Sequence, residues 1–177
     1  IEPYWGAGPG ASDMVDPQMT VLDKSEQPDH YRWHIQYRVE KEDTAYAFLL
    51  LPKPMPTAKS RQPVILCPHP TNGLGKKVVC GIYDTPPQNA QESYERRQRQ
   101  YALDLVRLGF ITFAPDMAGY GERVLIDLPT SRYNFEHVED FKQKWLAKWP
   151  GARFPHGKQL WDIQRAIDVV TNLEFVD

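Results

Sequence analysis

The stretch best suited to chemistry is a polar turn that follows a short apolar run. The run Pro63-Val64-Ile65-Leu66-Cys67 predicts a strand buried on both faces, and His69-Pro70-Thr71-Asn72-Gly73 comes just after it. Acyl transfer needs hydrogen-bond donors fixed where the carbonyl oxygen gains charge, and a backbone turn supplies N–H groups without reorganisation. Pro70 has no N–H, so Thr71 or Asn72 would have to donate. The alternative is that His69 only ties the loop down through its ring nitrogens.

A phosphate-binding loop is a second interpretation of the same region, because Gly75-Lys76 comes after the strand. In such a loop the first glycine would stand at position 70 and a Ser or Thr at position 77. Those positions hold Pro70 and Lys77, so the flexible glycine and the magnesium-binding hydroxyl are both missing. Residues 78–81 do not predict a helix whose N-terminus could hold phosphate. Nucleotide binding is therefore disfavoured.

Metal binding and a disulfide framework are also disfavoured. Cys67 and His69 are two residues apart, which is not the ligand spacing of a zinc site. A later acidic cluster is most simply the solvated face of a helix; it comprises Glu136, His137, Glu139 and Asp140. Two cysteines, Cys67 and Cys80, make no framework, and Cys67 reads as a buried, inert thiol.

Composition is that of a soluble globular domain of 177 residues, with 41% hydrophobic and 25% charged residues. The net charge of −2 gives no reason to expect nucleic acid or an anionic membrane as a partner. No apolar run reaches the roughly 20 residues of a membrane span, and no signal peptide is visible. A cytoplasmic location is expected. The chain begins at Ile1 rather than Met, so trimming and secretion are left open.

Two strands are predicted ahead of the turn. Residues 33–40 alternate apolar and polar, with His34 on the solvated side, and residues 44–51 form a second strand joined to the first by a hairpin. Residues 1–30 are rich in Gly, Pro, Asp and Ser and predict an extended arm that lies on the domain. The remaining residues, 31–177, predict a single domain.

A helix and a strand are predicted after the turn. Asn89 is the expected N-cap, Glu92 completes a capping box, and Gly109 is the expected C-cap. The expected apolar stripe of this helix is Tyr94, Tyr101, Leu105 and Leu108. Residues 110–114 form a short strand, so the two strands and the helix predict a right-handed parallel crossover. Asp116 is expected to order the loop at the end of this strand.

Residues 117–156 predict an insertion or cap-like segment that contains an aromatic helix. A last helix is expected from about 157 to 173 with an apolar stripe of Leu160, Ile163, Ile167 and Val170. Residues 175–177 then stand where such a crossover helix would lead into the next strand.

These features, in this order, resemble the α/β-hydrolase fold, especially its dienelactone-hydrolase-like and acetyl-xylan-esterase-like branches. The resemblance covers roughly residues 31–177. It rests on the hairpin, on the turn at 69–72, and on residues 101–123, where a helix and strand end in Pro115-Asp116 and a glycine-rich turn. The segment 161–168 resembles the helix that precedes the nucleophile strand.

The resemblance implies an α/β fold with a three-layer sheet and an enzyme that hydrolyses an ester, or a related acyl bond, through a serine acyl-enzyme. It carries Thr71 over as the oxyanion donor, with His69 and Asn72 shaping the turn. Pro70 departs from the family pattern and leaves the choice between Thr71 and Asn72 open. Candidates to wall the substrate pocket are Tyr120, Tyr133, Trp145 and Trp149. The family needs no metal and no organic cofactor, and the expected partner is a small-molecule ester.

None of the serines sits in the G-x-S-x-G context of a nucleophile elbow; they are Ser12, Ser25, Ser60, Ser93 and Ser131. The resemblance places the nucleophile, the acid and the base beyond residue 177. We therefore expect a domain truncated before the elbow, completed by a C-terminal half in the same or a second chain, with a homo-oligomer as a further option. The alternative function is a non-catalytic binding module on a hydrolase scaffold.

Overall fold

Two long antiparallel strands form the centre of the sheet. The computed structural model of the protein describes residues 9–71, 73–123, 143, 147 and 156–177. In it β2 (His30–Glu40) pairs with β3 (Asp43–Pro52), and Tyr37 lies opposite Ala45. Alternate residues of β2 from Ile35 to Val39 are buried because one face of the strand covers a core. The predicted hairpin is confirmed.

The complete sheet is mixed, with five strands in the order β1-β2-β3-β5-β4. β5 (Ile111–Pro115) pairs antiparallel with β3 and parallel with β4 (Val64–Leu66), which confirms the predicted parallel pairing. β4 lies at the end of this order, and its three residues are only partly buried. The expectation of a strand buried on both faces is met only in part: Val64 and Leu66 pack against one core cluster and Ile65 against the other, but none of the three is fully buried at this edge of the sheet.

The N-terminal region contributes to the sheet instead of only lying on it. After a short 3-10 turn, η1 (Ala11–Asp13), β1 (Thr20–Glu26) pairs antiparallel with β2. Its sequence, TVLDKSE, lacks an apolar face, and five of its seven residues are exposed. The backbone hydrogen bonds offered by β2 define this strand, so its side chains gave little sign of it.

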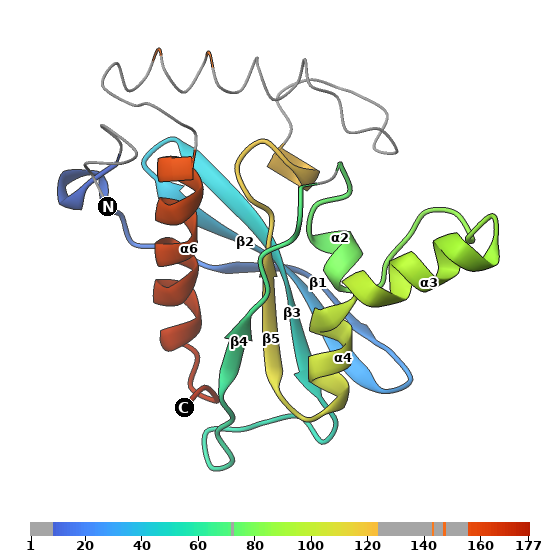
Figure 1. The fold of residues 1–177 in the computed structure, drawn as a ribbon. Coiled ribbons are helices and arrows are strands. Elements are labelled where there is room, and N and C mark those ends of the chain that lie inside the picture. Colours follow the sequence, from blue (N-terminus) through green and yellow to red (C-terminus); the bar gives the residue numbers. More distant parts are fainter. Residues whose placement is uncertain (1–8, 72, 124–142, 144–146, 148–155) are drawn as a thin grey trace.

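Helices cover both faces of the sheet, as Figure 1 shows. α6 (His156–Thr171) packs on one face through Ala166, Val169 and Val170, and α4 (Tyr101–Arg107) packs on the other through Ala102 and Val106. This is the helix–sheet–helix layering that the sequence predicted. Within the described residues, no helix combines the length and apolar character needed to cross a bilayer.

The buried helix faces match the predicted stripes in part. Val170 of α6 is buried as predicted, and Tyr101 and Leu105 pack against the core cluster on the α4 side of the sheet. Ile167 of α6 is 44% exposed, however, while Trp161 and Ala166 are buried. Tyr94 and Leu108 are 60% and 75% exposed, so they do not belong to the packed face. Alanines such as Ala102 and Ala166 occupy packed positions, and a stripe drawn only through large apolar residues misses them.

The helix predicted from Asn89 is two helices, α3 (Ala90–Arg99) and α4, separated at Gln100. The Asn89 cap is confirmed, because its side chain accepts a hydrogen bond from the Glu92 N–H at 2.8 Å. Gly109 after α4 has φ of +98°, as expected for a glycine that ends a helix.

The residues after α6 lie beside β4 (Figure 1). Gln62 pairs parallel with Val176: the Gln62 N–H donates to Phe175 O at 3.0 Å, and the Asp177 N–H donates to Gln62 O at 3.1 Å. The predicted lead from the last helix into a parallel strand position is seen here.

The hydroxyl of Tyr37 is a buried polar group that should lower the stability of the fold. Its side chain is 1% exposed, and among the described residues its hydroxyl has no hydrogen-bond partner. We expect Tyr37→Phe to raise the free energy of unfolding by about 1 kcal/mol, because it removes an unsatisfied buried group while keeping the ring. Tyr94→Phe, at an exposed position, is the control and should change little. Denaturant titration measures both, and a destabilised Tyr37→Phe variant would contradict the expectation.

Candidate active site

The turn at 68–71 and the loop after Asp116 meet where the parallel strands β4 and β5 end. The Met117 N–H donates to His69 Nε2 at 3.0 Å, which joins the two segments directly. The carboxyl ends of neighbouring parallel strands are where open α/β sheets place their ligands and chemistry. The sequence-predicted turn therefore lies at the edge of the sheet where such folds place their sites.

His69 is held as a neutral ring with both nitrogens in use. Nε2 accepts from Met117, so Nδ1 carries the proton and donates to Pro70 O at 2.8 Å. Burial lowers the pKa of His69, although the Pro70 carbonyl opposes part of that shift. The ring therefore fixes the turn, and neither nitrogen is available to remove a proton from a substrate.

Thr71 projects from this fixed turn into solvent. It is exposed, and in the part of the chain that the structure describes nothing accepts a hydrogen bond from its N–H. Pro70 before it has no N–H to offer. Asn72, the other expected donor, lies outside the described residues. Among the described residues of this turn, Thr71 therefore has a backbone N–H that remains available to another acceptor.

Asp116 is the centre of the hydrogen bonding behind the turn. Its carboxylate is fully buried, and Oδ1 accepts from the Lys76 N–H at 2.8 Å. Oδ2 accepts from Lys76 Nζ at 2.5 Å and from the Glu122 N–H at 3.0 Å. The loop-ordering role expected for Asp116 agrees with these contacts, which fix the start of α2 (Lys76–Val79) against η2 (Gly121–Arg123).

Two glycines are required by the closeness of Asp116. Gly75 and Gly121 have φ of +56° and +57°. A Cβ at either position would lie 2.2 Å or 2.1 Å from Asp116 Oδ1, which no side chain can accommodate. The glycine-rich sequences around 73–75 and 119–121 thus serve this carboxylate.

The helix α2 corrects one sequence inference. No helix was expected after Gly75, but residues 76–79 form a single helical turn. The interpretation against a phosphate loop is nevertheless supported, since Lys76 is 2% exposed and its ammonium contacts two carboxylates. That ammonium is not free to reach a nucleotide.

His34 belongs to the same network and was misjudged from the sequence as solvated. Its Nε2 lies 2.9 Å from Glu122 Oε1, and its ring packs against Phe48 with centroids 5.3 Å apart. Glu122 also contacts Lys76 Nζ. No local pattern could reveal this contact, because His34 and Glu122 are 88 residues apart.

A second buried ion cluster lies between η2, α6 and the β2–β3 turn. Arg123 contacts Asp162 and reaches Asp43 at 2.7 Å, while Lys158 lies 2.5–2.7 Å from Glu40, Asp43 and Asp162. Burial lowers the pKa of Lys158, but Asp162 and the other two carboxylates more than offset it, so the pKa is raised. Both cations therefore stay charged. The sequence analysis did not identify this cluster.

Of the expected pocket-wall residues, Tyr120 is at the site. Its ring meets the His69 ring edge-on, with centroids 5.3 Å apart. Three others, Tyr133, Trp145 and Trp149, lie outside the described residues, as does most of the expected insertion at 117–156.

No metal centre is present among the described residues, where no group of three or more His, Cys, Asp or Glu side chains could hold an ion. Cys67 and Cys80 are both buried. Burial raises the pKa of Cys67 to about 12 and raises that of Cys80 further. Neither thiol is a nucleophile near neutral pH.

Comparison with solved structures relates the fold of this chain to that of two esterases. No protein-family model and no curated protein sequence matches the chain. A putative acetyl xylan esterase from Bacteroides fragilis is similar in structure, with a TM-score of 0.69 and 18% identity over 92% of this chain and 40% of that one. Acetyl Xylan Esterase 1 from Thermoanaerobacterium sp. has a TM-score of 0.51 and 16% identity, over 92% and 43%.

At these identities the likeness concerns the fold. It confirms the resemblance to the acetyl-xylan-esterase-like branch of the α/β-hydrolase fold that the sequence indicated. The chain spans about 40% of the length of these two esterases.

Replacing Asp116 tests how much the buried Asp116–Lys76 ion pair contributes to stability. In Asp116→Asn, the amide nitrogen would face Lys76 Nζ or the Glu122 N–H, and an amide nitrogen cannot accept. We expect the free energy of unfolding to fall by about 3 kcal/mol or more, because the buried ammonium loses its main partner. Asp104→Asn, at an exposed ion pair with Arg107, should change it by less than about 1 kcal/mol. An equal loss of unfolding free energy in the two variants would show that the buried pair contributes no more than the exposed one.

The pH dependence of stability tests the neutral state of His69. Because its folded-state pKa is below the usual 6.5, the unfolded chain takes up a proton first as pH falls below that value. Stability should therefore be lost below about pH 6.5, by up to about 1.4 kcal/mol per pH unit. We expect the free energy of unfolding to fall less between pH 7 and pH 5 in His69→Gln than in the wild type. Parallel profiles in denaturant titrations would show that His69 is not responsible.

Proposed function

We propose that this chain supplies the oxyanion-stabilising part of an ester hydrolase that acts through a serine acyl-enzyme. The observation that carries the proposal is the turn at the end of β4. His69 fixes it on both sides, and the exposed Thr71 N–H has no acceptor among the described residues. The fold shared with two proteins named acetyl xylan esterases supports the same reaction class.

The turn would act when the ester carbonyl becomes tetrahedral. A serine oxygen attacks the carbonyl carbon, and the carbonyl oxygen takes on negative charge that a fixed N–H can stabilise. Thr71 is the proposed donor, with Asn72 as the alternative. His69 is a positioning residue in this scheme, since its two hydrogen bonds hold the donor in place without reorganisation.

The nucleophile is proposed to lie outside residues 1–177, in the same or a second chain. None of the serines in this sequence stands in a G-x-S-x-G context. Tyr120 packs against His69 and is a candidate to line the acyl pocket. The remaining candidates are Tyr133, Trp145 and Trp149.

The direct test is hydrolysis of p-nitrophenyl acetate by the protein purified at its natural length. We expect turnover, and we expect a fluorophosphonate probe to abolish it by labelling one serine. Absence of both turnover and labelling would refute the proposal and favour a non-catalytic module.

Removal of one N–H tests the role of the turn. Thr71→Pro should lower kcat for the acetate ester by about 100- to 1000-fold with little change in KM, because the lost donor acts mainly in the transition state. Steady-state kinetics on the natural-length protein measures this. An equal loss in Asn72→Pro alone, with Thr71→Pro fully active, would assign the donor to Asn72.

The matched control is Ala58→Pro. Ala58 is exposed in the turn between Thr57 and Ser60, where the Ser60 N–H donates to Thr57 O at 2.9 Å. Proline is well tolerated at the second position of such a turn. This variant should keep its activity, and an unchanged melting temperature in both variants would separate a chemical effect from misfolding.

A further inference from the structure

The turn that follows β4 has a second anchor, which comes from the helix α4. At the start of the turn, the Cys67 N–H donates to Phe113 O at 2.8 Å and ties the end of β4 to β5. Pro68 and Pro70 come next in the chain with one residue between them, and neither has an N–H with which to continue such a pattern. Side chains therefore have to fix this part of the turn.

Tyr101, the first residue of α4, is one of these side chains. Its hydroxyl donates to Pro68 O, one residue before His69. His69 is the other, since its ring is bound to Pro70 O and to the Met117 N–H. The turn is therefore held from α4 as well as from the loop after β5.

The Tyr101 hydroxyl is well suited to hold a main-chain carbonyl in place. Its ring packs against the core cluster that contains Cys67 and Ala102, and the Thr112 hydroxyl in β5 donates to Ala102 O at 3.2 Å. The first turn of α4 is thus fixed to the sheet next to the ring. Burial raises the pKa of Tyr101 to about 12, so the hydroxyl keeps its proton and remains a donor near neutral pH.

We propose that Tyr101 is a positioning residue of the ester hydrolase and that it acts on the reaction through the turn. With the chain held at Pro68 O and at the His69 ring, the Thr71 N–H has little freedom to turn away from a substrate carbonyl. A donor that is fixed in advance stabilises the oxyanion without reorganisation, so a loosened turn should slow the chemical step. This inference rests on the proposed function, because it concerns the same turn.

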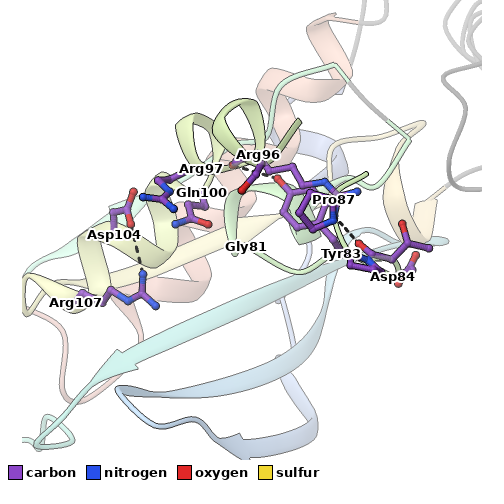
Figure 2. Close-up of a pocket in the computed structure, with 12 residues that line it drawn as sticks. Gly81, Tyr83, Asp84, Pro87, Arg96, Arg97, Gln100, Asp104 and Arg107 are labelled. Atoms are coloured by element: carbon purple, nitrogen blue, oxygen red, sulfur yellow. Dashed lines mark hydrogen bonds and ion pairs between the residues drawn. The ribbon is translucent and has the colours of Figure 1, made fainter. Parts of the chain in front are cut away.

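The alternative is that Tyr101 only packs in the core, and Tyr83 provides a matched control for it. Tyr83 is half-buried like Tyr101, and its hydroxyl also donates to a main-chain carbonyl, Arg96 O at 3.3 Å. It lines a groove of about 770 Å³ between the loop after α2 and the helices α3 and α4 (Figure 2). Its hydrogen bond therefore joins that loop to α3 and does not involve the turn.

Steady-state hydrolysis of p-nitrophenyl acetate by the natural-length protein tests the proposal. Tyr101→Phe keeps the ring and removes the hydroxyl, and we expect kcat to fall by about three- to tenfold with KM nearly unchanged. Tyr83→Phe should have the kcat and KM of the wild type. Because Tyr101 keeps its proton, the ratio of the wild-type kcat to that of Tyr101→Phe should be constant between pH 6 and pH 9.

A double-mutant cycle shows whether Tyr101 acts through the donor. In the Thr71→Pro background the N–H is already gone, so adding Tyr101→Phe should lower kcat by less than about twofold. Asn72→Pro takes the place of Thr71→Pro in the cycle if the donor proves to be Asn72.

Four results would overturn the proposal: an unchanged kcat in Tyr101→Phe, an equal loss in Tyr83→Phe, a full additional loss in the double variant, or a kcat ratio that varies with pH and so assigns proton transfer to Tyr101. Any of these, in a protein that hydrolyses the ester, would remove this inference and leave the proposed function. A wild type with neither turnover nor probe labelling would remove both.

Discussion

The buried carboxylate of Asp116 is the constraint on which the functional edge of this molecule depends. A carboxylate taken out of water is costly unless charge and hydrogen bonds replace its hydration. Here the replacement comes from the main chain and ammonium of Lys76 and from the main chain of Glu122. These donors belong to two segments of chain far apart in sequence. Satisfying one side chain therefore fixes β5, α2 and η2 relative to each other.

That fixed arrangement extends to the turn that would face a substrate. Met117, the residue after Asp116, donates to His69, and His69 in turn holds Pro70. On the other side of η2, Arg123 joins the second ion cluster that ties α6 to the β2–β3 turn. Apolar packing positions the helices on the sheet, but this edge is organised by charge and hydrogen bonds. Such contacts are directional, which suits a site where one N–H must keep its orientation.

The sequence predicted an element correctly where the pattern that indicates it lies within a few residues. The alternation in 33–40, the Asn89 cap and the glycine after α4 each depend on neighbours within a few residues, and each was confirmed. β1 and the partial exposure of β4 were missed because strand order decides both. His34, Glu122 and the cluster around Lys158 were missed because their partners are dozens of residues away. The turn at 69–71 could be located because a strand end is a local signal, but the reason for its rigidity, Met117, is a tertiary contact.

The two buried thiols have a practical consequence for studying this molecule. Cys67 follows β4 and Cys80 follows α2, so in sequence they flank the segment that carries His69 and Lys76, and both belong to the same core cluster. Because both are buried and protonated near neutral pH, an alkylating reagent reaches them only when this region opens. The rate at which the two thiols are alkylated under native conditions therefore measures how often this part of the core opens. It reports on that one region without any added label.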